Sequence, residues 1–150
     1  PEHRAWNFIS KPVLNVVVSH SMRLVYDDKY LHERCVRPLI LTDAQNVDPD
    51  FPIEIARFDE GITVRTIVEE LGRRNVKTLL IEGGGELIAQ FLAEGLVDEI
   101  YVTLCPKIIG GTASPPLIEG RRFGGNGIQE LRLLESETVG NEVFLHYGIE

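Results

Sequence analysis

Short apolar runs alternate with polar, turn-rich stretches along the first half of the chain. Val13–Val18 is nearly continuous in β-branched apolar residues, as expected of a strand that is covered on both faces. Leu39–Leu41 is a second short run, closed by Thr42 and Asp43, and Ile53–Phe58 is a candidate third run. Because turn-rich loops separate these runs, the pattern predicts three strands in this part of the chain.

Two amphipathic segments follow. Thr63 is a plausible N-cap, and the apolar residues after it recur at helical spacing, which predicts a helix over Thr63–Arg74. Val76–Ile81 is an apolar run that predicts a central strand. It leads through three glycines into a helix predicted over Glu86–Glu94, and Gly95 fits the stop of that helix. The apolar stripe of this second helix is Leu87, Ile88, Phe91 and Leu92.

The last third of the chain changes character. Val97–Leu104 predicts another strand, stopped by Pro106, and residues 106–127 form a loop rich in glycine and proline. Two alternating runs, Gln129–Glu137 and Glu142–Gly148, predict an antiparallel hairpin at the sheet edge. Strands alternate with helices before this point, so the predicted fold class is α/β: a mostly parallel sheet flanked by helices, with a C-terminal antiparallel hairpin.

Composition and charge narrow the function. The chain has 150 residues, which indicates one domain, and a formal net charge of −8. This acidic balance argues against wide nucleic-acid binding and against a membrane surface, because both favour lysine and arginine on one face. No apolar run approaches the ~18 residues of a membrane span. Cys35 and Cys105 lie far apart without metal or redox spacing, which indicates a reduced, intracellular protein and no metal site, although a single disulfide between them stays open.

Residues 82–85 form the most informative motif. Glu82 is followed by Gly83, Gly84 and Gly85, and then by the start of the second predicted helix. At such a start, unpaired backbone N–H groups and the positive end of the helix dipole favour an anion, and glycines let it come close. The motif lacks the Gly-Lys-Ser/Thr of a Walker A loop, and Ile88 stands where a dinucleotide fingerprint has its third glycine. A phosphate site and a merely tight strand-to-helix turn therefore both stay open.

Polar residues at the predicted strand ends are further candidates. Glu82 either faces a polar substrate, as a hydrogen-bond acceptor or proton relay, or is an exposed carboxylate near a helix start. Ser19, His20 and Ser21 follow the first strand, and ligands of open α/β sheets bind along this edge. His20 is either a ligand contact there or an ordinary surface histidine.

Four segments together resemble a known family. Residues 80–85, 95–99 and 106–111 read Leu-Ile-Glu-Gly-Gly-Gly, Gly-Leu-Val-Asp-Glu and Pro-Lys-Ile-Ile-Gly-Gly, and residues 16–24 read Val-Val-Val-Ser-His-Ser-Met-Arg-Leu. This combination resembles the reductase domain of bacterial riboflavin biosynthesis, which is often fused behind a deaminase and has a fold like dihydrofolate reductase. The resemblance covers nearly all of residues 12–149.

The resemblance implies NADPH-dependent reduction of 5-amino-6-(5-phosphoribosylamino)uracil, a phosphorylated pyrimidine, to its ribitylamino form. It also implies that Glu82 contacts the substrate. The preference for NADPH over NADH rests on this likeness alone, since Arg23, Arg73 and Lys107 are all available for the 2′-phosphate. The cofactor contacts implied by position are Ser19, His20, Thr42, Gly83, Gly84, Gly85, Glu86 and Leu87.

The chain also departs from the family pattern. Family members begin with a strand and helix that carry a substrate segment, whereas this sequence opens at Pro1, about where a further strand and its cofactor-contacting stretch finish. We therefore expect residues 1–150 to be a single reductase-like domain that is truncated at its N-terminus and lacks those elements. The family also implies a homodimer in the cytoplasm and a fused or separate deaminase domain.

Alternative functions stay open at this point. One is a reductase of another pterin or pyrimidine on the same fold, since the substrate arm is what would discriminate. A second is a non-catalytic NADP-binding or regulatory domain that is partnered with a deaminase. A third is a small α/β interaction module whose glycines only make a turn. NADPH oxidation separates the first from the second, and NADPH binding separates the second from the third.

Overall fold

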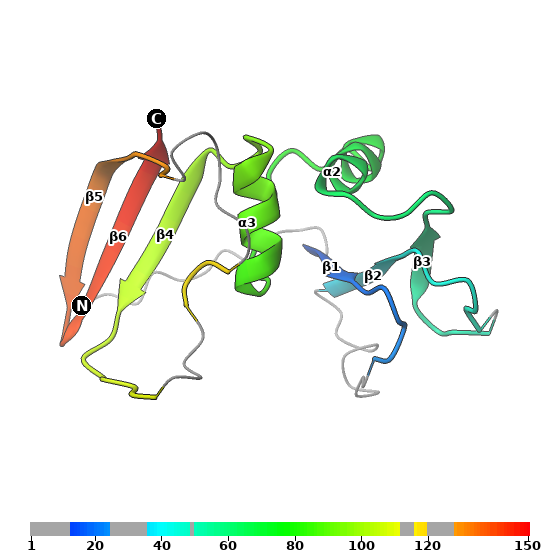
Figure 1. The fold of residues 1–150 in the computed structure, drawn as a ribbon, viewed down its shortest axis with the longest axis horizontal. Helices are drawn as coiled ribbons and strands as arrows, with labels where there is room; N and C mark the ends of the chain where they lie inside the picture. The colour runs from blue at the N-terminus through cyan, green and yellow to red at the C-terminus, as the bar shows by residue number, and fades with distance from the viewer. Residues whose placement is uncertain (1–12, 25–35, 49, 112–115, 120–127) are drawn as a thin grey trace. The chain divides into compact units, whose positions relative to one another are not determined.

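The computed structural model describes residues 13–24, 36–48, 50–111, 116–119 and 128–150 (Figure 1). The chain divides into two compact units, Pro1–Leu71 and Gly72–Glu150, each described here by itself. The described strands form two sheets of three strands each. Cys35 and parts of the predicted loop over residues 106–127 lie outside the described residues. In the described ranges, no helix has the length and apolar character needed to cross a membrane.

The first unit contains a parallel sheet in the order β1-β2-β3. Val16 of β1 lies opposite Leu39 of β2, and β2 pairs with β3 in the same parallel sense. Residues 39–42 of the middle strand are buried, which explains why the apolar run of β2 is continuous. All three strands predicted here are confirmed. Their bounds are β1 Val13–Val18, β2 Val36–Thr42 and β3 Glu54–Arg57.

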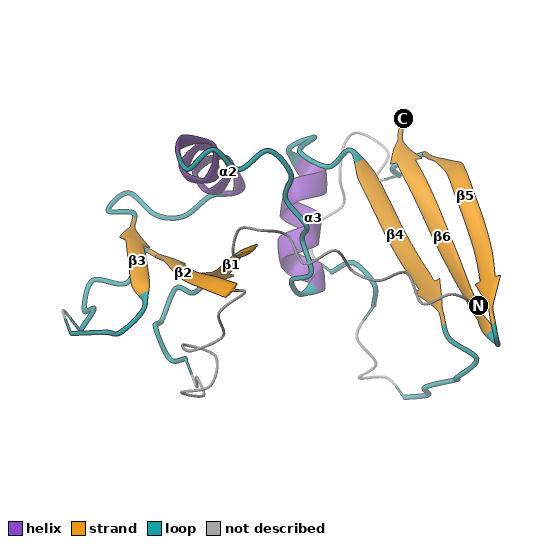
Figure 2. Ribbon diagram, turned by 180° about the vertical axis from the view of Figure 1, so that it is seen from behind, coloured by secondary structure: helices purple, strands orange, loops and turns teal. Residues whose placement is uncertain are grey.

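Helix α2 (Val64–Arg73) follows β3 in the chain, and Figure 2 shows it beside these strands. Thr63 caps the helix, because the N–H of Thr66 donates to Thr63 Oγ1 (3.2 Å) and the N–H of Thr63 donates to Thr66 Oγ1 (2.9 Å). The helix predicted over Thr63–Arg74 is therefore confirmed, with its cap. The buried apolar side chains of this unit are Leu39, Ile40, Leu41, Ile53, Val64, Ile67 and Leu71.

The second unit contains helix α3 and an antiparallel sheet in the order β4-β6-β5. Tyr101 of β4 lies opposite His146 of β6. Gly140 has a φ of +62° in the turn between β5 and β6, a left-handed conformation that glycine adopts readily. The expected C-terminal hairpin is confirmed. The bounds are α3 Gly85–Ala93, β4 Glu99–Leu104, β5 Leu131–Val139 and β6 Glu142–Ile149.

Helix α3 ends where the sequence predicts. Gly95 has a φ of +64° and its N–H donates to the carbonyl of Leu92 at 3.0 Å. The N–H of Leu96 donates to the carbonyl of Phe91 at 3.0 Å. This left-handed stop satisfies carbonyl groups that the last turn of a helix leaves free. Ala89, Phe91 and Leu92 of the helix are buried.

The structure differs from the expected sheet in two details, although the α/β class is confirmed. Val76–Ile81 is not a strand, since no described strand pairs with it, and Leu80 is 71% exposed. An apolar run becomes a strand only where a neighbour pairs with its N–H and C=O groups, and the pattern of a single segment does not carry that information. In the second difference, β4 pairs antiparallel with β6 rather than joining the parallel sheet.

Cys105 is exposed and free. Its Sγ donates a hydrogen bond to Oε1 of Glu142 at 3.4 Å. This bond to a carboxylate raises the pKa of the Cys105 thiol, because it stabilises the protonated form.

Candidate functional site

The start of α3 offers backbone N–H groups to a ligand. The N-cap is Gly84, whose carbonyl accepts the N–H groups of Leu87 (3.0 Å) and Ile88 (3.3 Å). Helix geometry leaves the N–H groups of the first helical residues, here from Gly85 onward, without partners inside the helix. The helix dipole adds positive potential at the same place. The arrangement is suited to hold an anion.

The three glycines of the motif differ in what the fold demands of them. A Cβ added at Gly85 would meet the backbone nitrogen of Glu119 at 2.8 Å, so packing within the chain requires glycine there. A Cβ at Gly83 would meet the flexible Leu87 side chain at 2.8 Å. A Cβ at Gly84 would meet nothing within 4 Å, and the φ of Gly84 is an ordinary −57°. Neither backbone conformation nor neighbouring atoms therefore explain Gly84, and the space beside it is open to a ligand.

The predicted residues around these glycines are accessible. Glu82, Gly83, Gly84 and Glu86 are exposed, while Gly85 and Leu87 are half-buried. Glu82 lies in a connection rather than at the end of a strand, and because the residue is exposed, its carboxylate does not face an apolar interior. The chemistry available here is a row of backbone donors beside the carboxylates of Glu82 and Glu86.

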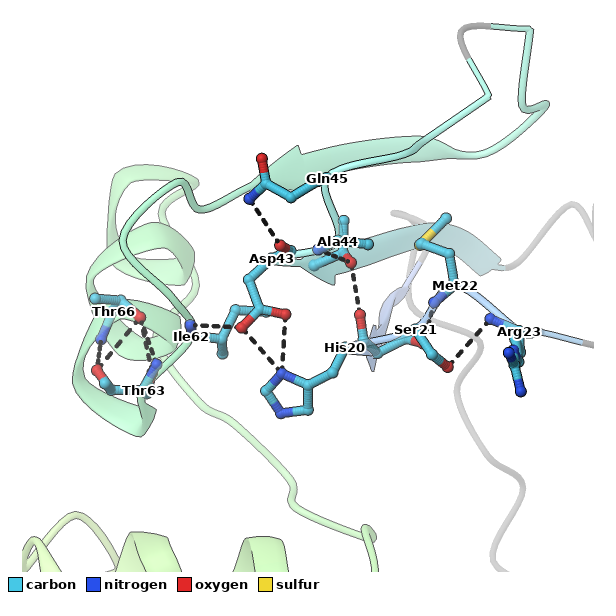
Figure 3. A network of polar contacts seen from close by, with 12 residues as sticks. His20, Ser21, Met22, Arg23, Asp43, Ala44, Gln45, Ile62, Thr63 and Thr66 are labelled. Atoms are coloured by element: carbon cyan, nitrogen blue, oxygen red, sulfur yellow. Dashed lines mark hydrogen bonds and ion pairs between the residues drawn. The ribbon is translucent and has the colours of Figure 1, made fainter.

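A second group of predicted residues lies in the first unit, where β1 and β2 end (Figure 3). Thr42 is fully buried; its hydroxyl donates to the carbonyl of Ser19 at 2.6 Å and accepts the N–H of Ala44 at 3.1 Å. Ser19 donates its N–H to the carbonyl of Leu41 and accepts the N–H of Met22 on Oγ. The Thr42 side chain therefore ties the two strand ends together, and its cofactor contact stays a prediction.

His20 is held by a carboxylate that sequence reasoning did not select. Its Nδ1 lies 2.9 and 3.0 Å from the two oxygens of Asp43. Oδ2 of Asp43 also accepts the N–H of Ile62 at 3.3 Å, so Asp43 links both strand ends to the loop that precedes α2 (Figure 3). The hydrogen bond from His20 lowers the pKa of the Asp43 carboxyl, and the N–H of Ile62 acts in the same direction. A signal for this pair existed, since Asp43 directly follows β2 and His20 lies two residues after the end of β1.

The predicted site residues thus form two groups, one in each compact unit. Ser19, His20 and Thr42 belong to the first. Glu82 and residues 83–87 belong to the second. Of the basic residues suggested for a 2′-phosphate, Arg23 and Lys107 are exposed, and Arg73 lies in the last turn of α2. In the described part of the chain, no three His, Cys, Asp or Glu side chains gather as a metal site would require.

The comparisons with known proteins identify a family and a fold. The RibD C-terminal domain matches residues 1–145. The 2,5-diamino-6-ribosylamino-4(3H)-pyrimidinone 5′-phosphate reductase of Archaeoglobus fulgidus is 35% identical over 88 residues, 58% of this chain and 38% of that protein. RibD of Acinetobacter baumannii has a similar fold, with a TM-score of 0.72 at 18% identity over 90% of this chain and 37% of that chain. The diaminohydroxyphosphoribosylaminopyrimidine deaminase/5-amino-6-(5-phosphoribosylamino)uracil reductase of Thermotoga maritima gives 0.64 at 16% identity, over 93% and 38%.

The likeness to solved structures extends over most of the chain and shows the fold. The chain spans between 29% and 56% of the length of the first curated relatives that it matches. The family match, in contrast, runs from the first residue to residue 145. This chain therefore belongs to the RibD C-terminal domain family.

Proposed function

We propose that this chain is an NADPH-dependent reductase domain of riboflavin biosynthesis, which reduces 5-amino-6-(5-phosphoribosylamino)uracil to the ribitylamino form. The observation that carries the proposal is the open helix start at Gly84 in a chain of this family. The Archaeoglobus fulgidus relative is named as a reductase of a diaminopyrimidinone phosphate. That compound is therefore the second substrate to test.

The start of α3 suits the diphosphate of the cofactor. Its N–H groups are suited to donate to phosphate oxygens. No described atom lies within 4 Å of a Cβ built on Gly84, so the oxygens have room beside this residue. Backbone donors and a helix dipole need no lysine or arginine, so the net charge of −8 does not oppose binding of an anionic cofactor. Ser19 and His20 are the proposed contacts from the first unit, with Thr42 behind them.

The chemistry of the step belongs to the cofactor. When bound, NADPH supplies the hydride that adds to the sugar C1′ of the ring-opened, imine-like substrate. The adjoining nitrogen gains a proton, and the product is an amine. The chain contributes by holding both reactants in one orientation, which removes the entropic cost of their meeting.

Glu82 is the proposed substrate residue. It is exposed and lies only two positions before Gly84, the N-cap of α3. A ligand bound at the helix start is therefore close to the residue that carries this carboxylate. An ionised carboxylate accepts hydrogen bonds from hydroxyl or amino groups of the pyrimidine substrate. It is also a candidate to relay the proton that the product gains.

The proposed assembly is a homodimer in the cytoplasm, alongside a deaminase domain. All nine residues of β5, one of the two edge strands of the antiparallel sheet, are exposed, and several are apolar. Such an edge favours pairing with a second copy of the chain. The Thermotoga maritima protein is named as both a deaminase and a reductase, which supports a deaminase as the functional neighbour.

An NADPH oxidation assay tests the proposal. The native polypeptide is mixed with NADPH and each of the two pyrimidine phosphates in turn, and the absorbance of NADPH is followed. Oxidation that depends on one of them is expected. A folded protein that is saturated with NADPH but oxidises none of it with either compound would exclude the reductase. A folded protein without affinity for NADPH would exclude the whole class of nicotinamide-dependent functions.

A further inference from the structure

The pair formed by His20 and Asp43 is built into the ends of two strands. His20 directly follows Ser19, whose carbonyl is tied to Thr42, and Asp43 directly follows Thr42. The side chain of Asp43 is 24% exposed, whereas that of His20 is 69% exposed. The carboxylate is thus anchored in the fold, and the ring that it holds projects toward solvent (Figure 3).

A second contact also holds the side chain of Asp43 in place. Oδ2 accepts the backbone N–H of Ile62 at 3.3 Å. Gly61, with a φ of +95°, forms the turn just before Ile62, and a Cβ added at Gly61 would lie 3.9 Å from Oδ2. Because the carboxylate is held from the α2 side as well as from β2, its oxygens are fixed where they meet Nδ1 of His20.

The partner of Nδ1 decides which nitrogen of the His20 ring carries the proton. An ionised carboxylate only accepts hydrogen bonds, so Nδ1 must be the donor. In the neutral ring, Nε2 then has a free lone pair and is the nitrogen that a ligand meets. In the described residues, no hydrogen bond to Nε2 is present.

We infer that Asp43 is a positioning residue: it fixes the His20 ring in the form protonated at Nδ1 and presents Nε2 to the bound cofactor. The inference rests on the proposed function for the identity of the ligand. It adds a residue that acts on the cofactor only through His20.

Asp43→Asn is the decisive variant. An asparagine oxygen in the place of Oδ2 still accepts the N–H of Ile62, while its NH2 group takes the place of Oδ1, 2.9 Å from Nδ1. As a donor at the shorter of the two distances, this group favours the form of the ring that is protonated at Nε2. Asp48→Asn is the matched control, because it removes the same charge on the same loop, keeps an acceptor for the N–H of Asp50, and has no contact with His20.

Two measurements are made on the intact chain. Ring ¹⁵N shifts of His20, assigned by their loss in His20→Ala, report the protonated nitrogen without any cofactor. We expect Nδ1–H in the unsubstituted chain and in Asp48→Asn, and Nε2–H in Asp43→Asn. NADPH titrations then form a double-mutant cycle. Asp43→Asn should weaken binding by roughly three- to tenfold, the loss of one hydrogen bond, and should have no further effect in the His20→Ala background.

The outcomes are distinct. The same ring form in the unsubstituted chain and in Asp43→Asn overturns the inference. Equal weakening of NADPH binding by Asp43→Asn with and without His20 also overturns it, because Asp43 would then act independently of His20. No NADPH binding by a folded, unsubstituted chain overturns the proposed function and the ligand contact together. The ring shifts still report whether Asp43 sets the ring, which separates that failure from the others.

Discussion

Gly85 lies against the backbone of Glu119 so closely that a Cβ added at Gly85 would meet the Glu119 nitrogen at 2.8 Å. At the preceding glycine, Gly84, an added Cβ would have no atom within 4 Å. Two adjacent glycines therefore have different reasons to be glycine. Packing of the chain explains Gly85, and we propose that access for a ligand explains Gly84.

This difference predicts that alanine substitutions at the two glycines affect different properties, stability at Gly85 and NADPH binding at Gly84. Gly85→Ala must displace the backbone at Glu119 and should lower the free energy of unfolding by about 1–3 kcal/mol. Gly84→Ala should change it by no more than about 0.5 kcal/mol but weaken NADPH binding by roughly tenfold, because the methyl group occupies the space proposed for the diphosphate. Urea unfolding and NADPH titration measure the two effects.

A glycine in α2 provides the control. A Cβ at Gly72 would also meet nothing within 4 Å, so Gly72→Ala adds the same methyl group away from the helix start of α3. It should stabilise the helix by roughly 0.5–1 kcal/mol and leave NADPH binding unchanged. Unchanged binding in Gly84→Ala would contradict the ligand explanation for Gly84.

Replacement of Glu82 by glutamine separates substrate contact from cofactor binding. Glu82→Gln keeps the size of the side chain but removes its charge and its capacity to relay a proton. We expect kcat/KM for the pyrimidine to fall by about 10²- to 10³-fold, while Kd for NADPH changes by less than about twofold. Steady-state kinetics and direct titration give the two values, and loss of NADPH affinity with retained turnover would move Glu82 out of the substrate site.

A polar cluster on the antiparallel sheet has its own pH signature. Oε2 of Glu99 accepts the hydroxyl of Tyr101 at 2.8 Å and lies 3.0 Å from Nε2 of His146. The Tyr101 and His146 rings stack with centroids 4.2 Å apart. The hydrogen bond from Tyr101, and then that from His146, lower the pKa of Glu99, while the bond to Glu99 raises the pKa of Tyr101. Ultraviolet titration should therefore show one tyrosine that ionises at higher pH than normal, and Glu99→Gln should return it to the ordinary range.

The same cluster contributes to stability in one direction of pH. The folded-state pKa of Glu99 lies below its unfolded value, so its contribution is complete above the unfolded value and is lost as the pH falls through the folded-state pKa. Urea unfolding in this acidic range should show a smaller loss of stability in Glu99→Gln than in the unsubstituted chain. An equal loss would indicate that the carboxylate has no folded-state partner in solution.

The exposed outer strand predicts the assembly. Leu133 of β5 is 52% exposed, and Leu104 on the opposite edge strand β4 is 54% exposed. If two copies pair through β5, Leu133→Lys places like charges across the interface and should raise the dimer dissociation constant at least about tenfold. Leu104→Lys is the matched control and should leave the dimer intact. Light scattering gives the mass in each case. If the unsubstituted chain is a monomer, the proposed homodimer is wrong.

Local patterns predicted the elements of this chain better than their pairing. The caps at Thr63 and Gly95 depend on residues a few positions apart, so the sequence alone predicts them. Of the apolar stripe predicted for α3, Phe91 and Leu92 are buried, whereas Leu87 and Ile88 are half-buried. Val76–Ile81 has an equally apolar pattern but no partner strand among the described residues. Pairing depends on segments distant in sequence, and no single run encodes it.

The candidate site shows the same limit. The position of Gly84 before a helix predicts a phosphate contact, and this contact stays a prediction beside the open space that the structure shows there. Asp43 was not selected, because its importance comes from contacts with His20 and Ile62, which lie 23 and 19 residues away. A rule that pairs polar residues at the ends of adjacent parallel strands would have found it.

The backbone amides of residues 83–87 provide the most direct test of the central claim, that a diphosphate binds at the start of α3. An ¹⁵N–¹H spectrum of the chain, recorded during titration with NADPH, reports each of these amides separately. If the diphosphate binds there, the amides of Gly84, Gly85 and Glu86 should shift most, with little change at Gly140 in the turn between β5 and β6. Saturable NADPH binding that leaves residues 83–87 unshifted would show that the diphosphate binds elsewhere.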